Sequence, residues 1–313
     1  MKAAIPAGKL LQWAPVAIFV LLLSIFGALS SRFLTVDNLS AILVQSSWLV
    51  VVATGMNAVL LTAGIDLSVG SAMYLAAVAV GLGLPSAPVW VCLVCSVLAG
   101  AAFGALNAAV IVRLGVRAFI ATLAMLFIGR GLGLYFSATR IVYANASVAD
   151  FGRGRLLGIA VPLWLAIGVT GFGWLLLNQT ALGPYVRSVG ADAEGARRAG
   201  VPTKAVQFSV YVLCGACAGL GGFVSLSQTA AASGAFGQNA EFLAIAAAVL
   251  GGTSLFGGRG HFGAPALGAV LITIVQNGLV LVNANPYAYP VITGAVIFSA
   301  ALLDSARRRL LGG

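Results

Sequence analysis

An aspartate interrupts a long apolar stretch of the sequence at residues 60–71, LLTAGIDLSVGS. A charged group at the centre of a membrane helix costs about 2.5–3.5 kcal/mol on insertion scales, so Asp66 must face protein or water. Gly64 and Gly70 flank it and permit a broken or re-entrant helix. Asp66 and Ser68 would then cap the exposed amides where the helix resumes. A turn between two spans would need the same caps, and direct contact of Asp66 with a substrate is the less favoured alternative.

Two further ionisable residues lie at or near membrane depth. Arg130, in LFIGRGLGL, is expected to support packing, either by pairing with an intramembrane acid or by snorkelling outward. Glu241, in GQNAEFLAI, begins an apolar segment, where a carboxylate suits the positive end of a helix dipole. Uncharged amides also lie within the apolar segments, and they suit either a neutral, hydroxyl-rich solute or polar helix packing: Gln45, Asn57, Asn107, Gln228, Gln276 and Asn277.

The sequence lacks the pattern of a nucleotide-binding or catalytic site. Only Lys9 follows a glycine, and Ala3 and Leu10 stand where a Walker A loop needs glycine and Ser or Thr. GRGHFG at 258–263 matches G-x-G-x-x-G, but no β-rich nucleotide-binding unit surrounds it. We expect this glycine-rich segment to form a tight re-entrant turn between two spans, with Gly251, Gly252, Gly257, Gly258, Arg259 and Gly260.

The sequence also lacks the side-chain patterns of a metal site and of covalent catalysis. His261 is the only histidine, so neither a histidine-rich metal site nor a Ser/His triad is expected. The cysteines form two C-x-x-C pairs, Cys92/Cys95 and Cys214/Cys217, each inside an apolar run, and we interpret them as small packing residues. The sequence therefore predicts a protein that is not an enzyme and that carries no metal or cofactor of its own.

The elements that position these residues are predicted to be membrane helices. Of the 313 residues, 61% are hydrophobic and 8% are charged, against about 25% charged in soluble domains. The apolar segments do not alternate in polarity as barrel strands would. We predict an all-α, polytopic integral membrane protein, a single transmembrane domain over residues 1–313. It has about ten spans: 14–31, 39–62, 68–84, 88–112, 118–136, 159–178, 206–229, 242–257, 262–283 and 288–305.

Basic residues fix the predicted orientation. The chain has 17 Lys and Arg against 7 Asp and Glu, and they lie in short loops, so the imbalance indicates membrane topology and not nucleic acid. With the N-terminus in the cytoplasm, twelve of these basic residues fall inside and four outside. Both termini are thus predicted to be cytoplasmic. The first segment, after Lys2 and Lys9, resembles a signal peptide, but its longer apolar core favours an uncleaved span.

Two polar connections stand out between the spans. The outer one, about 137–158, is mixed in charge. The inner one, about 179–205, contains DAEGARRAG, which could form a short amphipathic helix ended by Gly200 and Pro202 or remain a solvated loop. A short exposed helix on the inner face would suit docking of a partner protein.

Three stretches carry a family resemblance: LLTAGIDLSVGSAM (60–73), FIATLAMLFIGRGL (119–132) and IAAAVLGGTSLFGGRGHFGAPALGA (245–269). In this order they resemble the sugar permeases of bacterial ABC importers, the branch with the ribose, xylose, arabinose and galactose systems. The resemblance implies a multi-pass permease of the bacterial inner membrane that pairs with a second copy or a close relative. It also implies a periplasmic sugar-binding protein and a cytoplasmic ATPase that binds ATP and Mg²⁺.

In that family, the inner loop resembling 183–201 contacts the ATPase. Its usual pattern is Gly-x-x-x-Tyr-Ala-x-Gly-Gly-Asn, then Ala-Ala and a Gly-Ile. This chain differs by having Ala191–Asp192 where Gly-Asn is common and Arg198 where an apolar residue is usual. The resemblance predicts an ATPase-coupling segment, about 183–204, with Gly183, Tyr185, Gly190, Asp192, Glu194, Ala196, Arg197 and Gly200.

The predicted function is alternating access for a monosaccharide delivered by the binding protein, with ATP hydrolysis supplied by the partner. The predicted pathway and helix-break residues are Gly64, Asp66, Ser68, Gly70 and Asn57. An ion-coupled secondary transporter, with Asp66 or Glu241 carrying protons, is the alternative, and a structural membrane scaffold is a third hypothesis. Few intramembrane acids and a charged inner loop favour the ABC permease.

Overall fold

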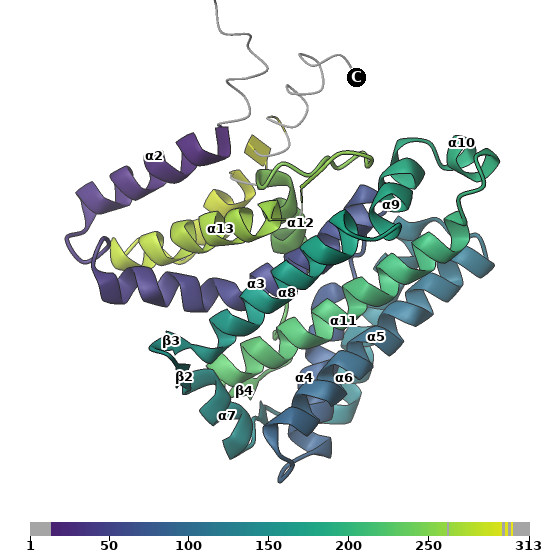
Figure 1. Ribbon diagram of the computed structural model, residues 1–313. Coiled ribbons are helices and arrows are strands. Elements are labelled where there is room, and N and C mark those ends of the chain that lie inside the picture. Colours follow the sequence, from purple (N-terminus) through teal and green to yellow (C-terminus); the bar gives the residue numbers. More distant parts are fainter. Residues whose placement is uncertain (1–13, 262, 296–297, 300–301, 303–313) are drawn as a thin grey trace, which may run out of the picture.

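The structure is a computed structural model that describes residues 14–261, 263–295, 298, 299 and 302 (Figure 1). Nearly all of the regular structure is helical. The first helices are α2 (Ala14–Leu29), α3 (Val36–Leu61), α4 (Val69–Gly83), α5 (Val89–Arg113) and α6 (Ala118–Ser137). Then follow β1 (Val142–Tyr143), α7 (Ala146–Arg153), β2 (Arg155–Leu156), β3 (Ile159–Ala160), α8 (Val161–Asn178), α9 (Leu182–Ala191), α10 (Ala193–Arg198), α11 (Thr203–Thr229), β4 (Ala231–Ala232), α12 (Ala240–Leu250) and α13 (Ala264–Leu281).

Six of the described helices are long and apolar enough to cross a membrane: α3, α5, α6, α8, α11 and α13. Residues 17–29 of α2, together with α4 and α12, form shorter apolar helices. This pattern supports the predicted polytopic membrane protein. The tenth predicted span, 288–305, includes 296–297, 300–301 and 303–305, which lie outside the described residues.

One predicted span, 242–257, is wrong in length. Helix α12 ends at Leu250 after 11 residues, which at 1.5 Å per residue reach only about 16 Å, roughly half of the hydrocarbon core. Two consecutive glycines stop the helix, and Gly252 takes a φ of 101° that an L side chain rarely adopts. The residues after Leu250 form a loop that returns to α13.

Helix α11 runs through the bundle and packs along α5, α3 and α4 (Figure 1). Its contact with α5 is built from glycines, because a Cβ at Gly100 would overlap the Gly215 carbonyl oxygen and one at Gly219 would overlap that of Ser96. Glycines four apart on each helix allow this close approach. The dense helix packing expected from GAAFG and GACAG is therefore confirmed.

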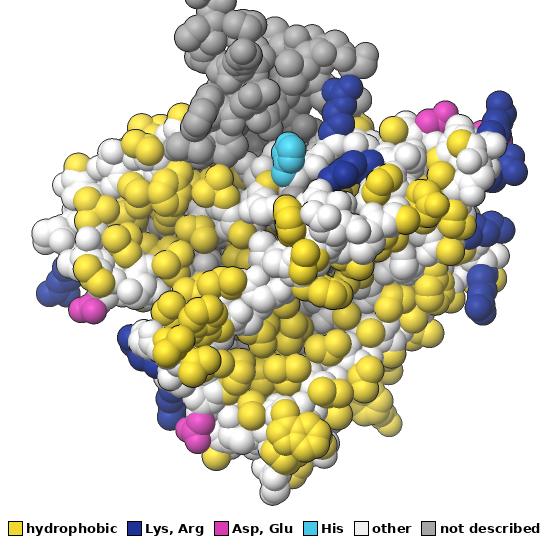
Figure 2. Space-filling view, viewed as in Figure 1, with side chains coloured by type: hydrophobic (Ala, Val, Ile, Leu, Met, Phe, Trp, Pro, Cys, Tyr) yellow, Lys and Arg dark blue, Asp and Glu magenta, His cyan; other side chains and the backbone are white. Residues whose placement is uncertain are grey.

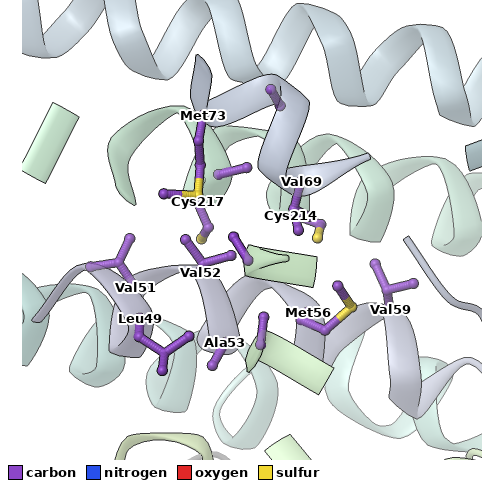
Figure 3. Close-up of a cluster of buried hydrophobic side chains, with 14 of the residues drawn as sticks. Leu49, Val51, Val52, Ala53, Met56, Val59, Val69, Met73, Cys214 and Cys217 are labelled. Carbon is purple, nitrogen blue, oxygen red and sulfur yellow. The ribbon is translucent and has the colours of Figure 1, made fainter. Parts of the chain in front are cut away.

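The main hydrophobic core lies where α3 faces α4 and α11. Figure 3 shows Val52 and Met56 of α3 beside Met73 of α4 and the α11 cysteines, Cys214 and Cys217. All four cysteines are free thiols, and Cys92, Cys214 and Cys217 are buried, as expected of packing residues. A separate cluster joins α2, α13 and the start of α3 and comprises Phe26, Phe33, Ile42, Ile274, Val275 and Leu279.

The surface follows the pattern of a membrane protein. In Figure 2 the middle of the visible face is mostly hydrophobic, whereas Lys and Arg gather at its upper right, over α9 and α10, and at its lower left. Large apolar side chains such as Phe127, Trp174 and Leu98 are exposed along the long helices. Lipid is the solvent in which such a surface is stable.

The outer connection 137–158 is folded more than its polar composition suggests. Helix α7 is capped by Asn145, whose side chain accepts a hydrogen bond from the Val148 N–H at 3.0 Å. The Asn145 amide also donates to the Leu84 carbonyl at 2.8 Å, which ties this connection to the end of α4. Two short antiparallel pairings, β1 with β4 and β2 with β3, complete this end of the molecule.

Candidate functional site

The helix break predicted around Asp66 separates α3 from α4. Asp66 is 1% exposed, and its Oδ1 accepts hydrogen bonds from the Ser68 N–H at 2.9 Å and the Ser68 hydroxyl at 2.7 Å. Asp66 thus caps the amide at the start of α4, as predicted. The capping role of Ser68 is wrong, because its backbone is helical (φ −87°, ψ −5°) and not extended, and its side chain bonds to no amide of α4.

Side chains from three other helices fix this break. Asn107 of α5 donates through Nδ2 to the Ser68 hydroxyl at 2.7 Å. Thr122 of α6 and Tyr211 of α11 both donate to the Ile65 carbonyl, at 3.3 and 3.4 Å. The break is therefore a buried structural junction, and Asp66 has no surface available for a substrate in this conformation.

The flanking glycines are sites of close approach. A Cβ at Gly64 would lie 2.6 Å from the Tyr211 hydroxyl oxygen, and one at Gly70 would overlap the Gly237 carbonyl oxygen. Glu241, in the first turn of α12 as predicted, lies on the same side of Gly70, because its Oε2 would be 2.6 Å from that Cβ. Glycine at 70 thus lets the start of α4 contact the loop that precedes α12.

The glycine-rich segment 251–260 forms a tight loop between α12 and α13, as predicted. The Ser254 N–H donates to the Arg259 carbonyl at 2.9 Å and closes it. The Gly258 N–H donates to the carbonyl of Leu61, the last residue of α3, at 3.0 Å. Asn57, one turn earlier in α3, accepts from the Thr253 hydroxyl at 2.6 Å. This loop is therefore attached to the end of the helix that precedes the Asp66 break.

The predicted coupling segment contacts the same point. Gly190 lies near the end of α9, where a Cβ would overlap the Leu61 carbonyl oxygen and lie 2.6 Å from the Gly258 nitrogen. A Cβ at Gly257 would lie 2.8 Å from the Gly190 carbonyl oxygen. Three groups of residues that the sequence placed far apart thus meet at Leu61. We call this contact of α9, the glycine-rich loop and the end of α3 the Leu61 junction.

Helix α10 presents a charged exposed surface beside this junction. Asp192 caps it by accepting from the Glu194 N–H at 3.1 Å, and Gly200 follows its end with a φ of 84°. Glu194 forms ion pairs with Arg197 at 2.7 Å and Arg198 at 3.2 Å, all exposed. Hydrogen bonds from these two guanidiniums lower the pKa of Glu194 to about 2. Of the two alternatives for DAEGARRAG, a short helix and a solvated loop, the structure has the helix.

Helix α9 was not predicted, since the inner connection was expected to be irregular before α10. Leu182, Val186 and Val189 recur at helical spacing, and this periodicity would have indicated the helix. Val186 and Val189 are buried. Gly183 packs against the Leu177 carbonyl oxygen, and Tyr185 remains 38% exposed. The buried side of α9 faces the bundle, and Ala196 of α10 is buried as well.

Arg130 packs in a way that the sequence did not specify. Its Nη1 donates to the carbonyls of Gly234 at 3.1 Å and Phe236 at 2.6 Å, and the guanidinium lies 5.3 Å from the centroid of the Tyr74 ring. Arg130 makes no ion pair with any described acid. The expected packing role is confirmed, and the partners are backbone carbonyls and an aromatic ring.

These features define a class of protein. The described chain is a bundle of membrane-length apolar helices whose broken interior helix is packed against an exposed, charged helical segment at one end. No group of three or more His, Cys, Asp or Glu among the described residues could hold a metal ion. This is the architecture of a multi-pass integral membrane protein.

The chain belongs to the family described as branched-chain amino acid transport system / permease component, whose sequence profile matches residues 38–301. It is 35% identical over 295 residues to the ribose import permease protein RbsC of Escherichia coli K12, covering 92% of both chains. It is 35% identical to the D-allose transport system permease protein AlsC of the same strain, covering 92% of this chain and 89% of the relative.

A further relative comes from another bacterium. The fructose import permease protein FruF of Bifidobacterium longum is 32% identical over 314 residues, covering 95% of this chain and 88% of the relative. No solved structure matches the chain. The chain is therefore a permease component and a multi-pass protein of the inner membrane.

Proposed function

We propose that this chain forms the translocation pathway of an ABC importer for a monosaccharide. The relatives above are named for the import of ribose, allose and fructose. The observation that carries the proposal is the Leu61 junction, where the α9–α10 segment contacts the helix that breaks at Asp66. A force applied to α10 from the cytoplasm has a packed route into the bundle.

The proposed mechanism is alternating access driven by a partner ATPase. ATP and Mg²⁺ bind to that partner, which grips α9 and α10. Closure of the ATPase displaces α9, and Gly190 transmits the displacement to Leu61 and Gly258 through backbone contacts too close to absorb it. Hydrolysis lets the segment return. Packed elements with two discrete arrangements are the physical basis for coupling over this distance.

The remaining partners follow from the two ends of the bundle. A periplasmic sugar-binding protein docks on the outer connection, which includes α7 and the β2–β3 hairpin and carries Arg153 and Arg155. A second copy of the chain or a close relative completes the pathway. Both termini and the α9–α10 segment lie in the cytoplasm in this proposal, on the side of the ATPase, and the basic residues around α10 favour that orientation.

Reconstitution tests this function. Proteoliposomes with the chain, its ATPase and a loaded binding protein should accumulate radiolabelled ribose, allose or fructose only when ATP is present, and a protonophore should have no effect. The chain alone should accumulate none of these sugars. Accumulation without an ATPase that a protonophore abolishes would establish the ion-coupled alternative instead.

A further inference from the structure

A cavity of about 440 Å³ opens beside the start of α12, within the range of small-molecule pockets, about 300–1,000 Å³. It lies between α3, the loop before α12, α13 and the segment after α13. The side chains that line it include five carboxamides and an aromatic ring: Gln45, Gln238, Asn239, Gln276, Asn277 and Tyr289. None of the described residues that line it is charged.

The amides buried among the helices fall into two groups. Asn57, Asn107 and Gln228 hold helices together: Gln228, for example, donates to the Val44 carbonyl at 2.7 Å and to the Ser47 hydroxyl at 2.8 Å. The side chains of the cavity amides, by contrast, form no hydrogen bond with any residue that the structure describes. Polar packing therefore explains the first group and not the second.

Asn277 shows most clearly the difference between the cavity amides and the amides that hold helices together. Its Oδ1 is buried and has no hydrogen-bond partner within the described part of the chain. The Oδ1 of Asn107 is also buried and unpaired, but Asn107 donates through Nδ2 to Asp66 and Ser68, whereas neither polar atom of the Asn277 side chain bonds to a described residue. Buried polar atoms in folded proteins almost always have a partner, and each exception calls for an explanation such as a ligand or a water. Beside it, Gln45, Gln238 and Gln276 supply further unpaired donors and acceptors around one space.

We propose that this cavity is the monosaccharide-binding subsite of the pathway, an inference that rests on the proposed function. Each carboxamide both donates and accepts, as does each sugar hydroxyl, so neutral amides match a polyol without the cost of burying charge. The Tyr289 ring, Leu243 and Val280 provide apolar surface for the C–H face of the sugar ring. An ion would find no counter-charge among the described residues of this lining.

The loop that carries two of the amides is held in place. Arg130 binds the carbonyls of Gly234 and Phe236, directly before Gln238 and Asn239. Asn239 itself adopts a left-handed backbone with a φ of 63°. The same loop contacts the start of α4 where Gly70 meets Gly237. A shift of α3 or α4 at the Leu61 junction would therefore change the spacing of the amides and release the sugar.

Leucine substitutions test the subsite. Gln276→Leu and Asn277→Leu, singly and together, remove polar atoms and keep comparable bulk, while Gln179→Leu makes the same change at an exposed residue outside the cavity. In the complete reconstituted transporter, with radiolabelled ribose as the probe, each cavity variant should lose about two- to tenfold in uptake, the effect of one lost hydrogen bond. ATP hydrolysis stimulated by the binding protein should remain within about twofold.

The outcomes separate this inference from the proposed function. Wild-type uptake by the double variant would overturn the subsite and leave the permease function intact. Absence of ATP-dependent uptake of ribose, allose or fructose by the wild-type system would instead overturn the proposed function. If a variant at Gln276 or Asn277 does not reach the membrane, Gln45→Leu applies the same test from a different helix, and unchanged uptake there would equally contradict the subsite.

Discussion

Asp66 shows how one buried carboxylate can define the shape of a chain. It satisfies an amide and a hydroxyl of Ser68 while three other helices bind the surrounding backbone and side chains. None of these contacts needs the negative charge, since each uses the carboxylate as an acceptor. The sequence context predicted a cap at this position, and the hydrogen bonds show which atoms form it.

We expect Asp66→Asn to be much milder than Asp66→Leu. Asparagine keeps an acceptor oxygen for the Ser68 N–H, whereas leucine leaves buried donors unpaired at about 1–3 kcal/mol each. Thermal unfolding in detergent and ATP-driven uptake should both show this order. Asp37, exposed in the first turn of α3, provides the control, because Asp37→Asn and Asp37→Leu should both be tolerated. Equal loss in the two Asp66 variants would favour a charge-dependent role such as proton transfer.

At the scale of helices, the contact between α9 and α3 explains how a displacement at the inner face can reach the bundle. Helix α9 ends against Leu61 with only a glycine between the backbones. Gly190→Ala, and more severely Gly190→Pro, should displace α9 and reduce sugar-stimulated ATP turnover by at least about tenfold, since overpacking costs about 1–3 kcal/mol. Membrane insertion should persist. Gly168→Ala in α8, where a Cβ would meet nothing within 4 Å, is the matched control, and normal turnover in the Gly190 variants would contradict the coupling route.

Helix α10 depends on its own ion pairs. Glu194→Arg would place three like charges on this six-residue helix and should weaken retention of the ATPase during copurification.

The pKa of Glu194 falls from an ordinary 4.5 to about 2, so its pairing stabilises α10 above about pH 4.5 and is lost as the pH falls toward 2. Retention should therefore not change between pH 5 and 8, although salt should weaken exposed pairs of this kind. A Glu194→Arg variant that retains the ATPase normally would exclude this role.

The sequence predicted elements better than it predicted their contacts. Capping by Asp192 and termination at Gly200 are local signals, and α10 follows from them. Helix α12 is shorter than predicted because hydropathy continues through residues whose backbone cannot remain helical at Gly252. Beside the Leu61 junction, Asn57 donates to the carbonyl of His261, 204 positions away. A local sequence pattern cannot predict a contact between such distant residues. It also cannot predict that Gln45 and Asn277 line the same cavity.

At the scale of the whole molecule, the mechanism requires its two ends to face opposite sides of the membrane. The end with α9 and α10 must meet the ATPase, and the end with α7 and the β2–β3 hairpin must meet the binding protein. Helices spanning the bilayer and an excess of basic residues at the α10 end support this orientation. The same orientation places the Leu61 junction between the ATPase and the proposed sugar subsite.

Thiol labelling of intact cells tests this arrangement. Arg155→Cys, in β2, should react with a membrane-impermeant maleimide added from outside, whereas Arg198→Cys, at the end of α10, should react only after permeabilisation. The native thiols supply a low background, because Cys92, Cys214 and Cys217 are buried, and Cys95→Ser removes the half-buried one. Lys and Arg at short loops orient spans because they remain in the cytoplasm during insertion, so the twelve basic residues assigned to that side predict this result. Labelling of Arg198→Cys from outside would show that the orientation is opposite to the proposed one and that α10 cannot contact a cytoplasmic ATPase.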